Sequence, residues 1–176
     1  MISNKMTQEL NKQINAELYS AYLYMAMSSY SSFIGLKGSA KWFFVQSREE
    51  MTHALRLYYY VISVGSHAVL GEIIKPQTTY KSLTNMFEET LAHEKKVTAM
   101  INNLVNLAVD EKDHATQVYL QWFVNEQVEE EANAKDILDK LKLAGEDGSG
   151  LFMIDNELGT RGFVFPPDLA AKQANA

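Results

Sequence analysis

The chain has 176 residues, of which 47% are hydrophobic and 22% are charged, and its net charge is −6. This length suits one domain with a full hydrophobic core, and an acidic chain without a lysine-rich arm is a poor partner for nucleic acid. It has neither an apolar run of ~20 residues nor a signal-peptide pattern at its start, so we expect a cytoplasmic protein that does not enter a membrane.

Glycine and proline separate long uninterrupted segments. Residues 77–144 contain neither of them, and the segments between the breaks are rich in Leu, Ala, Glu, Lys, Gln and Met. Such segments indicate long helices, and Asp113 is a suitable N-cap for the fourth of them. In chain order we expect helices over about residues 7–34, 39–64, 82–109, 114–143 and 151–158, followed by a tail.

The connections predict how these helices run. Short links join the first helix to the second and the third to the fourth, so each pair should be antiparallel. The link from Gly65 to Lys81 has 17 residues. It can extend over roughly 55 Å, whereas a helix of this size is about 40 Å long. The third helix should therefore begin parallel to the second, after a crossover along the whole bundle.

Each long helix carries a carboxylate in the middle of its apolar seam, when the seam is followed in steps of three and four residues. Side-by-side packing of the four helices would bring these groups into one central layer. The layer consists of Glu17, Glu50, His53, Glu94, Gln127 and Glu130. Tyr24 lies on the same seam as Glu17, seven residues further on, and should approach the layer.

Four carboxylates in a bundle core need counter-charge, because each ionised group costs several kcal/mol to desolvate and the groups repel one another. Two divalent cations would balance them, and Glu50 and His53 present two ligands from adjacent turns. The chain has no cysteine, so the ligands are oxygen and imidazole, which suit iron or manganese. The alternatives are protonated carboxylates and a structural bundle without activity.

The apolar residues of the short fifth segment recur at spacings of three and four. The apolar face of this helix, which is too short to be stable alone, would consist of Leu151, Phe152, Ile154 and Leu158. Because the seams of the four long helices already close their core, we expect this face to pack against other subunits. We expect His67, His93 and His114 to be loop or surface residues.

Several segments of the chain resemble the bacterial non-haem ferritins. They are residues 15–20 (NAELYS), 49–53 (EEMTH), 120–127 (LQWFVNEQ), 129–131 (EEE) and 137–141 (ILDKL). The resemblance reaches to about Thr160 and implies an all-α, ferritin-like four-helix bundle with one long crossover and a short fifth helix. We accordingly divide the chain into a ferritin-like di-iron domain, residues 1–162, and a C-terminal tail, residues 163–176.

The resemblance also implies an activity, that of a ferroxidase. Members of this family oxidise Fe(II) to Fe(III) with dioxygen or hydrogen peroxide and store the product as a ferric mineral inside a hollow shell of 24 subunits. The implied ligands of the first iron are Glu17, Glu50 and His53. The implied ligands of the second are Glu94 and Glu130, with Glu50 bridging and Gln127 nearby.

Further residues gain a role only from the resemblance. A third iron position would use Glu49, Glu126 and Glu129, with Glu130 shared; without the resemblance these residues are typical of a solvated helix face. Tyr24 would have a redox or hydrogen-bonding role, the alternative being an ordinary core tyrosine.

Haem is the remaining question. Bacterioferritins, the haem-containing relatives, ligate haem through a methionine at the position of Met51, which should face outward. They also carry a second Glu-x-x-His motif, where this chain has Gln127-x-x-Glu130. We therefore expect a non-haem protein, with a haem-containing bacterioferritin as the alternative.

Overall fold

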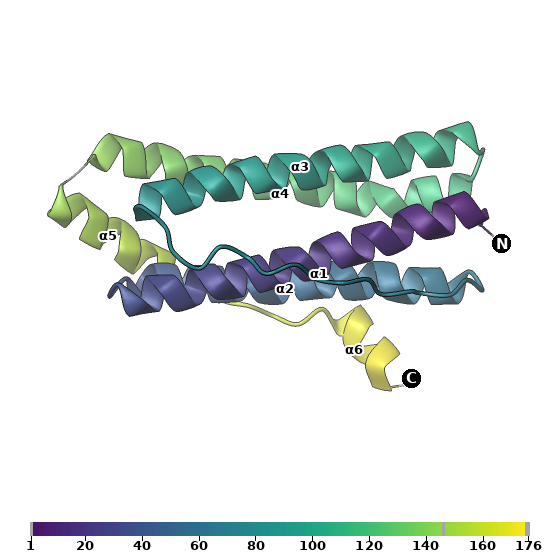
Figure 1. The fold of residues 1–176 in the computed structure, drawn as a ribbon, viewed down its shortest axis with the longest axis horizontal. Helices are drawn as coiled ribbons and strands as arrows, with labels where there is room; N and C mark the ends of the chain where they lie inside the picture. Colours follow the sequence, from purple (N-terminus) through teal and green to yellow (C-terminus); the bar gives the residue numbers. More distant parts are fainter. Residues whose placement is uncertain (1, 146, 175–176) are drawn as a thin grey trace.

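The computed structural model describes residues 2–145 and 147–174 of the chain, and in these ranges it contains six α-helices and no strand (Figure 1). The helices are α1 (Asn4–Phe33), α2 (Lys37–Ser63), α3 (Leu83–Asp110), α4 (His114–Ala144), α5 (Gly148–Leu158) and α6 (Pro167–Ala174). None of the described helices is both long enough and apolar enough to span a membrane.

The four long helices form two antiparallel pairs, α1 with α2 and α3 with α4, as predicted. The connection after α2 runs back along the bundle, so that α3 begins at the same end as α2 (Figure 1). Asn15 of α1 holds this connection, since its amide donates to the Glu72 carbonyl at 2.8 Å and its side-chain oxygen accepts from the Gly71 amide at 3.1 Å. The predicted single long crossover is confirmed.

Polar side chains set the starts of the long helices. The side chains of Ser3, Ser82 and Asp113 each accept a hydrogen bond from a backbone amide of the first turn of α1, α3 and α4. The cap at Ser3 explains why α1 begins at Asn4, three residues earlier than expected. The predicted start of α4, directly after Asp113, is confirmed.

The core consists of two apolar clusters separated by the polar layer. One cluster lies at the end near α5 and includes Tyr24, Phe43 and Phe87, whereas the other includes Leu10 and Leu120. The polar side chains between them are as buried as the apolar ones, with exposed fractions of 1–5%. Every residue predicted for the layer, and Tyr24 beside it, is buried. Packing thus aligns the middles of the four helices.

Helix α5 packs against its own chain, which corrects the expectation that its apolar face is reserved for other subunits. Ile154 and Leu158 are buried in the core cluster, and the Asp155 carboxylate accepts hydrogen bonds from the Gly38 and Ser39 amides at 3.0 and 2.7 Å. A Cβ at Gly38 would lie 1.6 Å from the Asp155 carbonyl oxygen, so the close approach of α5 to α2 requires glycine there.

Helix α6 was not expected from the sequence. It begins at Pro167, where the fixed φ of proline suits the first turn of a helix. Leu169 is fully buried, and Asp168 forms an ion pair with Arg56 of α2 at 2.6 Å. Helix α6 is therefore attached to the outside of α2.

Candidate metal centre

The carboxylates predicted to share a layer come together in the interior of the bundle. Three groups of side chains place ligand atoms within 4.8 Å of one another, and all the groups lie among the described residues. They are Glu17, Glu50 and His53; Glu50, Glu94 and Glu130; and His53, Glu126 and Glu130. Glu50 belongs to the first two groups, so one carboxylate lies between two potential metal positions.

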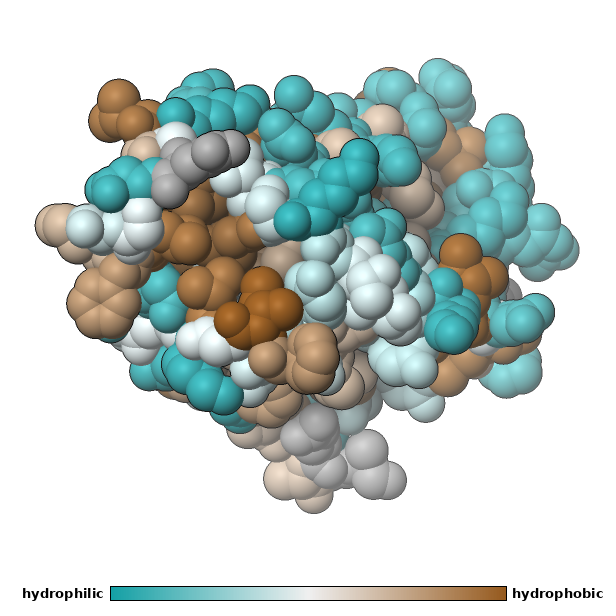
Figure 2. Space-filling view, turned by 60° about the vertical axis from the view of Figure 1, so that its left-hand side comes forward, coloured by the Kyte–Doolittle hydropathy of each residue, from teal (hydrophilic) through white to brown (hydrophobic). Residues whose placement is uncertain are grey.

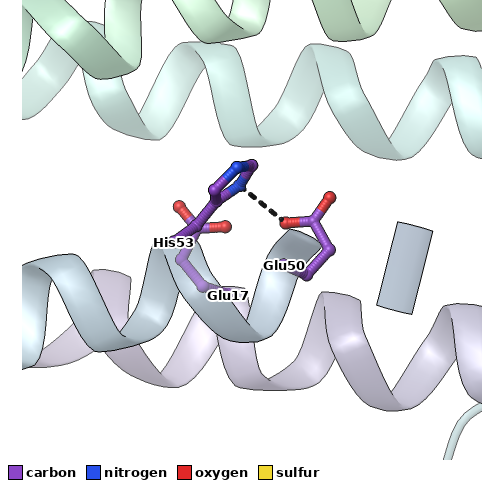
Figure 3. Close-up of side chains that lie close together, drawn as sticks. All are labelled: Glu17, Glu50 and His53. Atoms are coloured by element: carbon purple, nitrogen blue, oxygen red, sulfur yellow. Dashed lines mark hydrogen bonds and ion pairs between the residues drawn. The ribbon is translucent and has the colours of Figure 1, made fainter. Parts of the chain in front are cut away.

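Helix geometry explains the first group. Glu50 and His53 stand three residues apart on α2, and the His53 Nδ1 atom lies 3.3 Å from the Glu50 Oε2 atom. Glu17 reaches the same space from α1, and all three side chains point between the helix pairs (Figure 3). Two carboxylates and one imidazole from two rigid helices therefore converge without any loop residue.

Buried amide side chains hold the carboxylates in place. Gln13 donates to Glu17 at 2.8 Å, and Gln46 donates both to Glu50 at 2.9 Å and to Glu130 at 2.8 Å. We had not singled out Gln13 or Gln46 from the sequence. Each lies four residues before a layer glutamate on the same helix face, and this i, i+4 spacing is the signal that could have identified them.

Gln127, which was predicted, has a similar role. Its amide nitrogen lies 3.3 Å from an Oε atom of Glu94 and 3.3 Å from Thr98 Oγ1. Tyr24 is fully buried, its ring stacks on Phe43, and its hydroxyl donates to Glu94. Tyr24 is thus both a core residue and a hydrogen-bond partner of the layer.

Burial makes the ionised layer unfavourable without a cation. Burial, which removes water from the charged form, and repulsion from neighbouring carboxylates both raise the pKa of these groups. The pKa of Glu17, Glu50 and Glu94 rises to about 8 and that of Glu130 to about 7. The Glu17 Oε2 atom is buried without a hydrogen-bond partner in the described part of the chain. A free carboxylate oxygen beside an imidazole and a second carboxylate fits a divalent cation.

The residues suggested for a third metal position are arranged differently. The Glu126 Oε1 atom lies 3.9 Å from His53 Nε2 and belongs to the group that includes Glu130. Glu49 forms an ion pair with Arg161, a residue that we had not considered. Glu129 is exposed and belongs to none of the three groups.

Other residues show where the sequence was informative. His67 lies in the crossover and His114 at the exposed start of α4, as expected. His93 is only in part the surface residue expected, since it lies on α3 partly exposed, 2.7 Å from Ser20 Oγ, and burial lowers its pKa to about 4. Met51 is 42% exposed and faces away from the layer, as the helix period predicts.

The metal-free protein should lose stability as pH rises from about 5 to 8. Between the ordinary carboxyl pKa of 4.5 and the raised values near 8, the folded chain holds protons that the unfolded chain has released. We expect the free energy of unfolding, measured by denaturant titration, to fall by more than about 3 kcal/mol across this window. Bound Zn²⁺ should remove most of the fall, because the cation takes the place of the protons.

Glu17→Gln is the control for this pH dependence, since it deletes one titrating group and should make the fall shallower. A metal-free protein whose stability rises between pH 5 and 8 would contradict the proposed electrostatics of the layer.

Known proteins match both the fold and the sequence. The ferritin-like domain family matches residues 7–144. A probable bacterial non-heme ferritin-like protein of Haemophilus influenzae is 45% identical over 159 residues, 90% of this chain and 96% of that protein. The bacterial non-heme ferritin of Escherichia coli is 42% identical over 160 residues, 91% of this chain and 97% of that protein. The open pore ferritin of the archaeon Archaeoglobus fulgidus superposes with a TM-score of 0.91 at 48% identity, covering 92% of this chain and 99% of that chain.

Proposed function

The chain belongs to the ferritin family, in its non-haem branch, and we propose that its buried layer is the ferroxidase centre in which two Fe(II) ions are oxidised. The proposed ligands are Glu17, Glu50 and His53 for one iron and Glu94 and Glu130 for the other, with Glu50 shared and Gln127 orienting Glu94. One observation carries this assignment: Glu50 belongs to both groups of converging ligand atoms, so a single carboxylate can bridge two metal ions.

The protein stores iron, and its chemistry is that of a ferroxidase. Fe(II) is the substrate, and carboxylate oxygens are hard donors that favour Fe(III), which lowers the barrier to electron loss. Two irons on one bridge can together transfer two electrons to one dioxygen, which accepts two protons and leaves as hydrogen peroxide. Because the layer carboxylates are protonated near neutral pH in the metal-free state, Fe(II) binding releases protons.

The second position has no imidazole ligand, and this supports turnover. Glu94 and Glu130 supply only carboxylate oxygens, whereas His53 adds nitrogen to the first position. A storage enzyme must release its Fe(III) product, and the position without an imidazole ligand is the one from which we expect release to begin.

We propose a third metal position at Glu49, Glu126 and Glu129, with Glu130 shared. The grouping of Glu126 with Glu130 and His53 supports it. Iron would pass through this position on its way from the buried pair to the surface. Glu130 is buried, whereas Glu49 and Glu126 are partly exposed.

We propose that the chains assemble as a shell of 24 subunits. Large apolar side chains on the bundle support this assembly, since Phe33 is 85% exposed and Leu143 is 90% exposed in the single chain. The similarity to bacterial non-heme ferritins over 96–97% of their length supports it as well, because members of this family form such shells. The cytoplasmic location and the domain division at residue 162 stay predictions.

Aerobic addition of Fe(II) tests the function. The metal-free protein should generate ferric absorbance well above the rate in buffer, with two Fe(II) consumed per chain in the first fast phase. Protein purified without added metal should contain iron and elute as a particle of many subunits. If oxidation is no faster than in buffer, the chain is a structural bundle with a vestigial layer.

A further inference from the structure

The segment of residues 159–174 crosses the outside of α2 and is attached at both ends; we call it the C-terminal segment. At one end the Gly159 carbonyl accepts a hydrogen bond from Lys41 Nζ at 2.9 Å. At the other, Asp168 pairs with Arg56 and Leu169 is fully buried. Residues 161–166, between the two attachments, have no regular secondary structure and lie along α2 (Figure 1). The middle of the segment is therefore held by side-chain contacts with α2 and not by a hydrogen-bonded helix of its own.

Arg161 stands at the start of this irregular stretch and points toward the metal centre. Its Nη2 atom pairs with Glu49, and its guanidinium carbon lies 4.5 Å from the centre of the Trp42 ring. The side chain is 20% exposed, and the Nη1 atom is buried without a hydrogen-bond partner in the described part of the chain. A buried donor without a partner is unfavourable, so a rotation of the Arg161 side chain that exposed Nη1 to water would recover a hydrogen bond.

The charge of Arg161 acts on two of the residues proposed for the third metal position. It opposes the burial that raises the pKa of Glu49, and to a smaller extent it opposes the burial that raises the pKa of Glu130. A guanidinium stays protonated at every physiological pH. A permanent positive charge is thus held against Glu49, close enough to Glu130 to act on its carboxyl group.

We propose that Arg161 is a latch on the third metal position: its guanidinium occupies Glu49 in the metal-free protein and must move aside before Glu49 can bind a metal ion. This inference rests on the third position proposed above. The latch lowers the affinity of that position relative to the buried pair, so the pair fills first. It also couples metal binding at Glu49 to a shift of the C-terminal segment.

Titration of the metal-free, full-length protein with Zn²⁺ by calorimetry tests the latch, because Zn²⁺ binds oxygen and nitrogen ligands and undergoes no redox change. Wild type should show two tight binding events and one weak event per chain. Arg161→Gln should tighten the weak event at least tenfold and leave the two tight events unchanged. Arg161→Lys keeps the charge and should restore the weak event.

Arg48→Gln is the matched control. Arg48 lies on α2, next to Glu49, and contacts the C-terminal segment: its guanidinium carbon lies 4.2 Å from the centre of the Phe163 ring. This variant removes one positive charge and one contact with the segment but leaves the Glu49–Arg161 pair intact. Its weak event should stay within about twofold of wild type.

Glu49→Gln separates the latch from the metal position on which it depends. We expect this variant to lose the weak event both alone and combined with Arg161→Gln. If Glu49→Gln abolishes the weak event but Arg161→Gln binds Zn²⁺ as wild type does, the latch is refuted and the third position stands. If Glu49→Gln leaves all three events unchanged, both proposals fail.

Discussion

Glu17→Ala and Glu130→Ala should each slow the first phase of Fe(II) oxidation roughly 100-fold or more, because each removes a proposed ligand from one of the two iron positions. The fold should survive, since the two apolar clusters on either side of the layer stay intact and a buried carboxyl group is itself unfavourable. Stopped-flow absorbance of the ferric product gives the rate, and circular dichroism gives the helical content.

Two further variants test whether the loss of the carboxylate ligand causes the slower oxidation. Glu17→Gln preserves side-chain volume and should be about as slow as Glu17→Ala, because an amide is a poorer ligand than a carboxylate. Glu9→Ala removes an exposed acidic residue two turns earlier on α1, where Glu9 pairs with Lys12 at 2.7 Å, and should oxidise Fe(II) at the wild-type rate. Wild-type rates in both Glu17→Ala and Glu130→Ala would overturn the ligand assignment.

The second large effect concerns assembly and depends on the two faces of α5. Ile154 and Leu158 are buried in their own chain, whereas Phe152 and Met153 are 67% and 72% exposed. Figure 2, which brings the α5 end of the molecule forward, shows apolar residues gathered there among hydrophilic ones. An exposed apolar pair on a short helix indicates a contact with neighbouring subunits.

The double variant Phe152→Glu/Met153→Glu should break the shell into smaller oligomers, because four charges or more would meet wherever several copies of α5 converge. Each subunit should keep its helical content and its fast first oxidation phase, but less mineral should be retained per chain. Light scattering after size-exclusion chromatography measures the particle mass.

Truncation at Gly148 should have the same effect on assembly with an added loss of stability. It removes Ile154 and Leu158 from the core as well, at a cost of roughly 3 kcal/mol or more, and it deletes the Asp155 hydrogen bonds to α2. Intact, mineral-loaded particles of 24 subunits at normal stability from either variant would show that α5 is dispensable for assembly.

The sequence alone determined the bundle and the layer, for local reasons. Steps of three and four residues identify one face of each helix, and a capping residue such as Asp113 marks where a helix begins. Short links and one long crossover leave few ways to pack four helices of similar length, so a glutamate in the middle of each seam has to meet the others. That is why Glu17, Glu50, Glu94 and Glu130 could be grouped before any coordinates were known.

The tertiary structure decided which groups surround that layer. Arg161 reaches Glu49 across 112 residues of sequence. Gln46 of α2 donates a hydrogen bond to Glu130 of α4, which lies 84 residues further along the chain. Helix α6 depends on Leu169 and on the pairing of Asp168 with Arg56, which also lie 112 residues apart. Spacing along one helix can relate Gln46 to Glu50, but it cannot show which residue of a distant segment each side chain meets, because that depends on how the helices pack. Local spacing therefore places the proposed ligands, whereas the hydrogen bonds and charges that surround them are determined only by the packed chain.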